Sequence, residues 1–132
     1  MSDLSTALAD EFTEAIFKNT APTILPVANV YVTLYDGTGT EIDGDLQNGR
    51  VQTAPADWTL TTSNDVENAT EVNFGEALSD ISQISEVALF DAATGGSEIA
   101  RYALEESFDV STATRVFFPV ATLTFDVLDR TE

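Results

Sequence analysis

The residues best suited to chemistry lie in one glycine-containing stretch, Asp36-Gly-Thr-Gly-Thr-Glu-Ile-Asp-Gly-Asp45. Its acidic members are Asp36, Glu41, Asp43 and Asp45. Hard cations such as Ca²⁺ and Mg²⁺ prefer carboxylate and carbonyl oxygens, and glycine permits the tight turns that gather such oxygens. The spacing departs from that of the EF-hand, in which ligands alternate and a glutamate closes the loop. Two interpretations stay open: a weak Ca²⁺ or Mg²⁺ site, or a solvated loop of an acidic protein.

The side chains on which most enzymes depend are missing. The chain has no histidine and no cysteine, which removes the usual general base near neutral pH, the thiol nucleophile and the commonest metal ligands. Carboxylate pairs such as Glu105–Glu106 remain, and a glycosidase needs two carboxylates that face each other across a cleft. Close pairs arise by chance in a chain with 23 acidic residues. We therefore expect no catalytic residue and no enzyme.

The charge balance limits the partners that this chain can bind. Its 23 acidic and 5 basic residues give a formal net charge of -18. Nucleic-acid phosphates and anionic membranes would be repelled, so we expect neither as a partner. A lysine-poor, acid-rich surface that repels itself at low salt and is screened at high salt is typical of halophilic proteins. An acidic mesophilic protein would have the same composition.

Two sparse features have both a structural and a functional interpretation. The four arginines, Arg50, Arg101, Arg115 and Arg130, are rare enough that each is expected to be paired, within the chain or with an acidic partner. Surface pairs of this kind are worth about 0–1 kcal/mol each. Asn68-Ala-Thr70 is a glycosylation sequon, for which a polar stretch leading into a strand is the favoured interpretation.

The first 26 residues are predicted to form an arm. Leu4, Leu8, Phe12 and Ile16 recur every four residues and form one apolar stripe, which predicts a helix over residues 3–17. Prolines then prevent its continuation through residues 19–26. The stripe either docks on a partner or a second copy, or packs on the rest of the same chain.

Beyond residue 26 the hydrophobic period changes from 3.6 to 2, which predicts strands. Residues 76–85 are ambiguous between helix and strand, and residues 116–128 form the longest strand pattern. The spacing of about eight short strands predicts a β-sandwich or a barrel over residues 27–132. The strands are predicted at residues 30–35, 50–53, 58–62, 70–74, 87–90, 99–104, 108–110 and 116–128.

One turn carries a recognisable pattern. In Val87-Ala-Leu-Phe-Asp-Ala-Ala-Thr-Gly-Gly96, Asp91 can accept a hydrogen bond from the backbone two residues on, while Gly95 and Gly96 supply positive φ angles. The turn would fix the register of the flanking strands. The pattern resembles a family of small structural proteins of tailed viruses, described as tail-fibre-like or capsid-decoration proteins.

Three further segments follow the order of that family: Asn29–Tyr35, Glu71–Ala77 and Phe117–Val127. The resemblance covers roughly residues 8–128. A Trp-Gly pair that the family carries before the Val87 strand is replaced by residues 79–83.

The resemblance implies a virion protein with a mainly β, jelly-roll-like sandwich of about eight strands and one N-terminal helix. The leading hypothesis is a capsid decoration or cement protein of a tailed, haloarchaeal virus. It would form dimers or trimers, bind the major capsid protein or other virion proteins through the arm, and stabilise the shell. The first alternative is a tail-fibre, turret or baseplate component of the same kind of virus. The second alternative is an interaction module that binds Ca²⁺ through the acidic loop.

Overall fold

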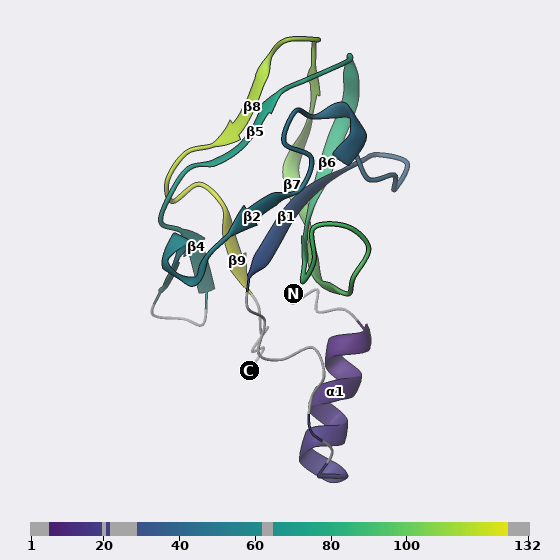
Figure 1. Cartoon of the computed structure of the whole chain (residues 1–132), viewed down its shortest axis with the longest axis vertical. Helices are drawn as coiled ribbons and strands as arrows, with labels where there is room; N and C mark the ends of the chain where they lie inside the picture. Colours follow the sequence, from purple (N-terminus) through teal and green to yellow (C-terminus); the bar gives the residue numbers. More distant parts are fainter. Residues whose placement is uncertain (1–5, 20, 22–28, 62–64, 127–132) are drawn as a thin grey trace.

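The computed structural model describes residues 6–19, 21, 29–61 and 65–126 (Figure 1). Within these ranges it contains one α-helix and nine strands, so the mainly β fold with an N-terminal helix is confirmed. The helix predicted from the apolar stripe is α1 (Thr6–Phe17), and two short 3-10 turns are η1 (Asp43–Asp45) and η2 (Pro55–Asp57). The strands are β1 (Val30–Asp36), β2 (Val51–Thr53), β3 (Trp58–Leu60), β4 (Asp65–Asn68), β5 (Val72–Glu76), β6 (Ile81–Phe90), β7 (Glu98–Val110), β8 (Arg115–Phe118) and β9 (Thr124–Asp126).

The strands form three antiparallel sheets. The largest has the order β2-β1-β6-β7, the second β3-β4-β9, and the third is the pair β5-β8. These orders do not confirm the jelly-roll arrangement. No helix within the described ranges is long and apolar enough to cross a membrane.

The core lies on one face of the four-stranded sheet. Alternation along β1 places Val32 and Leu34 on that face, next to Leu89 and Val87 of β6, and all four are buried. Phe74 of β5 and Phe125 of β9 belong to the same core cluster, so the two smaller sheets cover this face. Burial of each large apolar side chain stabilises the fold by about 1.5–3 kcal/mol.

The opposite face of the same sheet carries aromatic and polar side chains. Tyr35 and Phe90 are buried there beside Ala88, and Thr33 is fully buried. A valine and a leucine side chain of β1 are buried on one face, and its threonine and Tyr35 side chains are buried on the other. Both faces of the sheet are therefore covered. On this face the guanidinium groups of Arg50 and Arg101 lie over the rings of Phe90 and Tyr35.

Several strand predictions needed correction. β4 was not predicted, and the predicted strands 99–104 and 108–110 form the single strand β7. The ambiguous segment 76–85 is not a helix: from Ile81 onward it belongs to β6, which pairs with both β1 and β7. The predicted last strand, residues 116–128, is divided into β8 and β9 by a turn in which the N–H of Thr122 donates to the carbonyl of Pro119. The longest strand is instead β7, whose register against β6 is interrupted by bulges.

Asn68 explains the division of the last strand. Its side chain is buried and donates from Nδ2 to the carbonyls of Thr70 and Pro119, both at 2.9 Å. Its Oδ1 accepts from the N–H of Leu123 at 2.9 Å. The amide therefore supplies the backbone partners that a continuous strand would have used. In the folded protein the sequon asparagine has a structural role, because its side-chain nitrogen is enclosed by these contacts.

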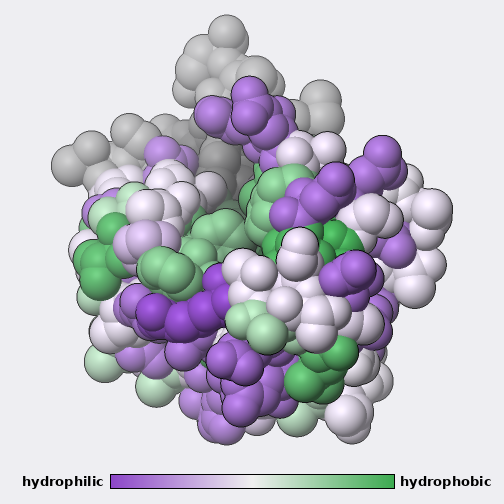
Figure 2. Space-filling model, turned by 90° about the horizontal axis from the view of Figure 1, so that it is seen from above, coloured by the Kyte–Doolittle hydropathy of each residue, from purple (hydrophilic) through white to green (hydrophobic). Residues whose placement is uncertain are grey.

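The end of the sheets opposite α1 presents no continuous apolar face. Viewed from that end, hydrophobic residues form small separated patches among hydrophilic ones (Figure 2). The helix lies beyond the other end of the sheets (Figure 1). Scattered apolar groups are normal on a protein surface and by themselves indicate no partner.

Candidate functional site

The acidic loop is built by hydrogen bonds within the protein. Oδ1 of Asp36 accepts the N–H of Thr38 at 2.9 Å, the N–H of Thr40 at 3.0 Å and the Thr38 hydroxyl at 2.7 Å. The hydroxyl of Thr38, followed by these backbone donors, holds the pKa of the Asp36 carboxyl below its usual value. Asp36 thus closes its own turn at the end of β1.

The other acids of the loop face different partners. Asp43 and Asp45 form η1, where Oδ1 of Asp45 accepts the hydroxyl of Ser79 at 3.0 Å. Within the described part of the chain, no group of three or more acidic side chains is arranged to hold a metal ion. The loop is also less solvated than expected, because Ile42 and Leu46 are buried in the core.

Glu41, another member of the predicted weak metal site, is bound by two side chains of the protein itself. Its Oε2 accepts Nε of Arg50 at 2.7 Å and the hydroxyl of Thr33 at 2.7 Å, and its Oε1 accepts from Nη2 of Arg50 at 3.0 Å. Both carboxylate oxygens are therefore occupied. The hydrogen bonds from Arg50 lower the pKa of Glu41, and those to Glu41 raise the pKa of Arg50.

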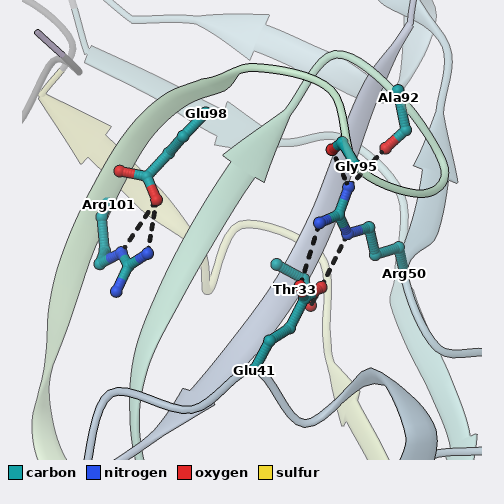
Figure 3. A network of polar contacts seen from close by, with 7 residues as sticks. All are labelled: Thr33, Glu41, Arg50, Ala92, Gly95, Glu98 and Arg101. Carbon is teal, nitrogen blue, oxygen red and sulfur yellow. Dashed lines mark hydrogen bonds and ion pairs between the residues drawn. The ribbon is translucent and has the colours of Figure 1, made fainter.

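The remaining donors of Arg50 bind the turn between β6 and β7 (Figure 3). Nη1 donates to the carbonyls of Ala92 at 2.9 Å and Gly95 at 2.8 Å. The guanidinium carbon lies 3.9 Å from the centre of the Phe90 ring. We call Arg50, Glu41, Thr33, Ala92 and Gly95 the Arg50 network. It joins β1, the acidic loop, the residue that precedes β2 and the β6–β7 turn on the aromatic face of the large sheet.

In the β6–β7 turn the two glycines have the positive φ angles that we expected, but Asp91 binds a more distant residue than expected. Gly95 and Gly96 have φ angles of +59° and +73°. Oδ1 of Asp91 accepts the N–H of Ser97 at 2.7 Å, a contact that spans six residues where the sequence led us to expect two. A Cβ atom at Gly96 would lie 2.5 Å from that Oδ1, so the turn requires glycine there. The register Phe90↔Glu98 follows.

Two more arginines repeat the same combination of carboxylate and ring. Arg101 lies 3.8 Å from the centre of the Tyr35 ring and binds Glu98 at 2.5 Å. Arg115 lies 4.1 Å from the Phe117 ring centre and pairs with Glu71. The expected pairing of the arginines is confirmed for these three, and Arg130 lies outside the described residues. No spacing in the sequence indicates the aromatic partners of these arginines.

The apolar stripe of the helix is described in part. Leu4 lies outside the described residues, and Leu8 and Phe12 belong to α1 but their side chains are outside the description. Ile16 is 73% exposed. Sequence reasoning missed Phe17, which is off the stripe and is 80% exposed. The structure therefore leaves the end of α1 without a covering partner among the described residues.

The contacts described above are structural: they pin loops and turns to a β framework. Residues 3–126 match a family model described as "Podophage GP4 fiber I protein gp80". The match spans nearly the whole chain, so the chain belongs to this family of phage fibre proteins. A search among curated proteins finds no match.

Membership settles the class of protein. The chain is a structural component of the virion and belongs to a non-enzymatic family of fibre proteins. A fibre is the alternative that the sequence analysis placed behind capsid decoration, and the family supports it better than the leading hypothesis. The family description names a podophage and gives no support to a haloarchaeal origin.

Proposed function

We propose that the chain is a subunit of a tail fibre, in which an N-terminal arm, residues 1–26, attaches a β-sheet body, residues 27–132, to another virion protein. The observation that carries this proposal is the exposure of two neighbouring large apolar side chains, Ile16 at 73% and Phe17 at 80%, where α1 ends. Amphipathic helices commonly bind by placing such side chains in a groove of the partner.

The arm binds through the stripe Leu4, Leu8, Phe12 and Ile16, with Phe17 beside it. Apolar contacts suit this chain because its charge opposes purely electrostatic attachment to other acidic surfaces. Several copies, as a dimer or trimer, would bind together, so each contact can be weak while the assembly stays attached.

Labelling of virus particles distinguishes the fibre from the capsid. Purified particles are incubated with gold-tagged antibody against this chain and viewed by electron microscopy. Label confined to the tail is the expected result. Label spread over the head would overturn the fibre proposal in favour of a decoration protein on the major capsid protein, and absence of label on intact and opened particles would overturn both.

A second experiment tests the arm. The double variant Ile16→Asp, Phe17→Asp places charges at exposed positions, so the β body should unfold at an unchanged temperature. Its amount per particle should fall about tenfold, since burial of two charges opposes docking. The matched control is Leu60→Asp, because Leu60 is 81% exposed on β3. Normal incorporation of the double variant, or equal loss in the control, would contradict the arm proposal.

The Ca²⁺-module alternative has a direct test as well. Engagement of both Glu41 oxygens by Arg50 and Thr33 opposes cation binding at this residue. We expect no increase in unfolding temperature when millimolar Ca²⁺ is added. A clear increase that is lost in Glu41→Gln would restore the loop as a cation site.

A further inference from the structure

Two sheets of the body end in open strand edges. β7 is the last strand of the order β2-β1-β6-β7, and β9 is the last of β3-β4-β9. Among the described strands, neither has a hydrogen-bonded neighbour on its outer side. An unpaired edge presents a row of N–H and C=O groups that can pair with an added strand.

These two edges border one groove. It has a volume of about 380 Å³, and we call it the β7–β9 groove. Its floor is apolar: Val87 is buried, and the rings of Tyr102 and Phe125 lie 4.7 Å apart between centres. Its rim carries exposed side chains from both edges, namely Ala103, Glu105, Thr122 and Thr124. Backbone donors and acceptors above an apolar floor are what a bound extended strand uses, with main-chain bonds for affinity and pockets for alternate side chains.

The charge of the edge selects the occupant. Glu105, Glu106 and Asp109 are exposed along β7. Acidic side chains on an edge oppose pairing with a second copy of the same edge, and the net charge of -18 adds a general repulsion between copies. The same charges attract a strand with basic side chains.

We propose that the β7–β9 groove binds an extended strand of another virion protein, in which basic side chains alternate with apolar ones. The apolar side chains would contact the half-buried Tyr102 and Leu104, and the basic ones would lie near Glu105. Only the source of the partner, the virion, rests on the proposed fibre function. The site differs from the arm, which binds through a helix.

The test uses the full-length chain and a synthetic peptide, acetyl-Lys-Val-Lys-Val-Lys-Val-Lys-amide. Hydrogen exchange is measured residue by residue with and without the peptide. We expect the amides of β7 between residues 102 and 109 that point away from β6, and those of β9 at residues 124 and 125 that point away from β4, to exchange about tenfold more slowly when the peptide is present. An otherwise identical peptide with glutamate in place of lysine should give no protection.

Two controls separate strand addition from unspecific attraction. A lysine–valine peptide with alternate backbone nitrogens methylated keeps its charge but cannot pair with an edge, so it should not protect. Glu105→Lys should weaken binding of the first peptide about tenfold. Glu76→Lys makes the same charge change at an exposed position outside the groove and should leave binding unchanged.

Four results would overturn the proposal. They are absent protection, equal protection by the methylated or acidic peptide, protection that grows with protein concentration when no peptide is added, and protection that is already complete in the isolated monomer. The third would identify a second copy as the occupant, and the fourth would identify another part of the same chain. None of them affects the gold-label or arm experiments, so this proposal can fail while the fibre function stands.

Discussion

Arg50 and Arg115 have the same kinds of partner in two very different regions of the molecule. Each guanidinium pairs with a glutamate and lies about 4 Å from the centre of a phenylalanine ring. The side chains of Arg50 and Glu41 are only 6% and 19% exposed, whereas those of Arg115 and Glu71 are 48% and 40% exposed. The difference shows that burial and extra partners, rather than the type of pair, separate a fold-determining contact from a surface one.

The difference in exposure follows from what surrounds each guanidinium group. Arg50 lies over the Phe90 ring on the aromatic face of the large sheet and donates to two turn carbonyls as well as to Glu41 (Figure 3). Loss of either charged partner would leave the other poorly solvated. Arg115 lies on the short β5-β8 pair, where water can replace a lost partner. The first region should therefore respond strongly to substitution and the second weakly.

The largest effect is expected for Arg50→Met. The substitution keeps an unbranched apolar stem against Phe90 but removes the charge and all donors, leaving Glu41 unpaired and largely buried. We expect a loss of about 3–5 kcal/mol in the free energy of unfolding. Urea denaturation followed by Trp58 fluorescence measures it. A loss no greater than that of Arg115→Met would contradict the comparison.

Glu41→Gln should have the next largest effect, and that effect should depend on pH. The pKa of Glu41 is lowered in the folded state from an ordinary value of 4.5, so its contribution is fully present above that value. It is lost as the pH falls through the lower pKa of the folded protein. The stability difference between the wild type and Glu41→Gln should be constant near neutral pH and narrow in acid. A difference that widens as the pH falls would contradict the assignment.

Gly96→Ala tests the turn that the Arg50 network holds. The new Cβ would lie 2.5 Å from Oδ1 of Asp91 and 2.7 Å from Cβ of Ala92, at a φ of +73°. We expect a loss of about 1–3 kcal/mol from strain, measured as a lowered unfolding temperature. Gly44→Ala is the matched control, since its Cβ would meet no atom within 4 Å and its φ is not positive. Equal losses in the two variants would show that the turn tolerates a side chain.

The sequence allowed us to predict individual strands and the hairpin between β6 and β7. It did not allow us to predict features that depend on contacts between distant residues. Alternation along residues 30–35 predicted β1 and both of its faces, and the glycine pair predicted the β6–β7 hairpin, because these signals come from neighbouring residues. The break between β8 and β9 depends on Asn68, which is 55 residues from Leu123. A polar residue before a strand gives no sign that its amide will replace ladder bonds elsewhere.

The Arg50 network shows the same limit for a site. Rarity of basic residues predicted that each arginine would be paired, but spacing could not select Glu41 among 23 acids. The carbonyls of Ala92 and Gly95 lie 42 and 45 residues away and carry no side-chain signal. Within the acidic stretch, the Glu41 carboxylate binds Arg50 and the Asp36 carboxylate closes its own turn, and neither contact could be read from the spacing of the acids.

The smallest effect is expected for Arg115→Met, at about 0–1 kcal/mol. Because this pair is exposed, the small loss should vanish in about 1 M NaCl, where the Debye length is near 3 Å. The loss in Arg50→Met should persist in the same salt, since buried pairs are screened much less. The wild type should itself become more stable in salt, as its net charge of -18 is screened. Urea denaturation of the wild type, Arg50→Met and Arg115→Met at low and high salt measures these free energies of unfolding. If high salt abolished the loss of stability in Arg50→Met as fully as in Arg115→Met, the two ion pairs would differ in geometry but not in their contribution to the free energy of unfolding.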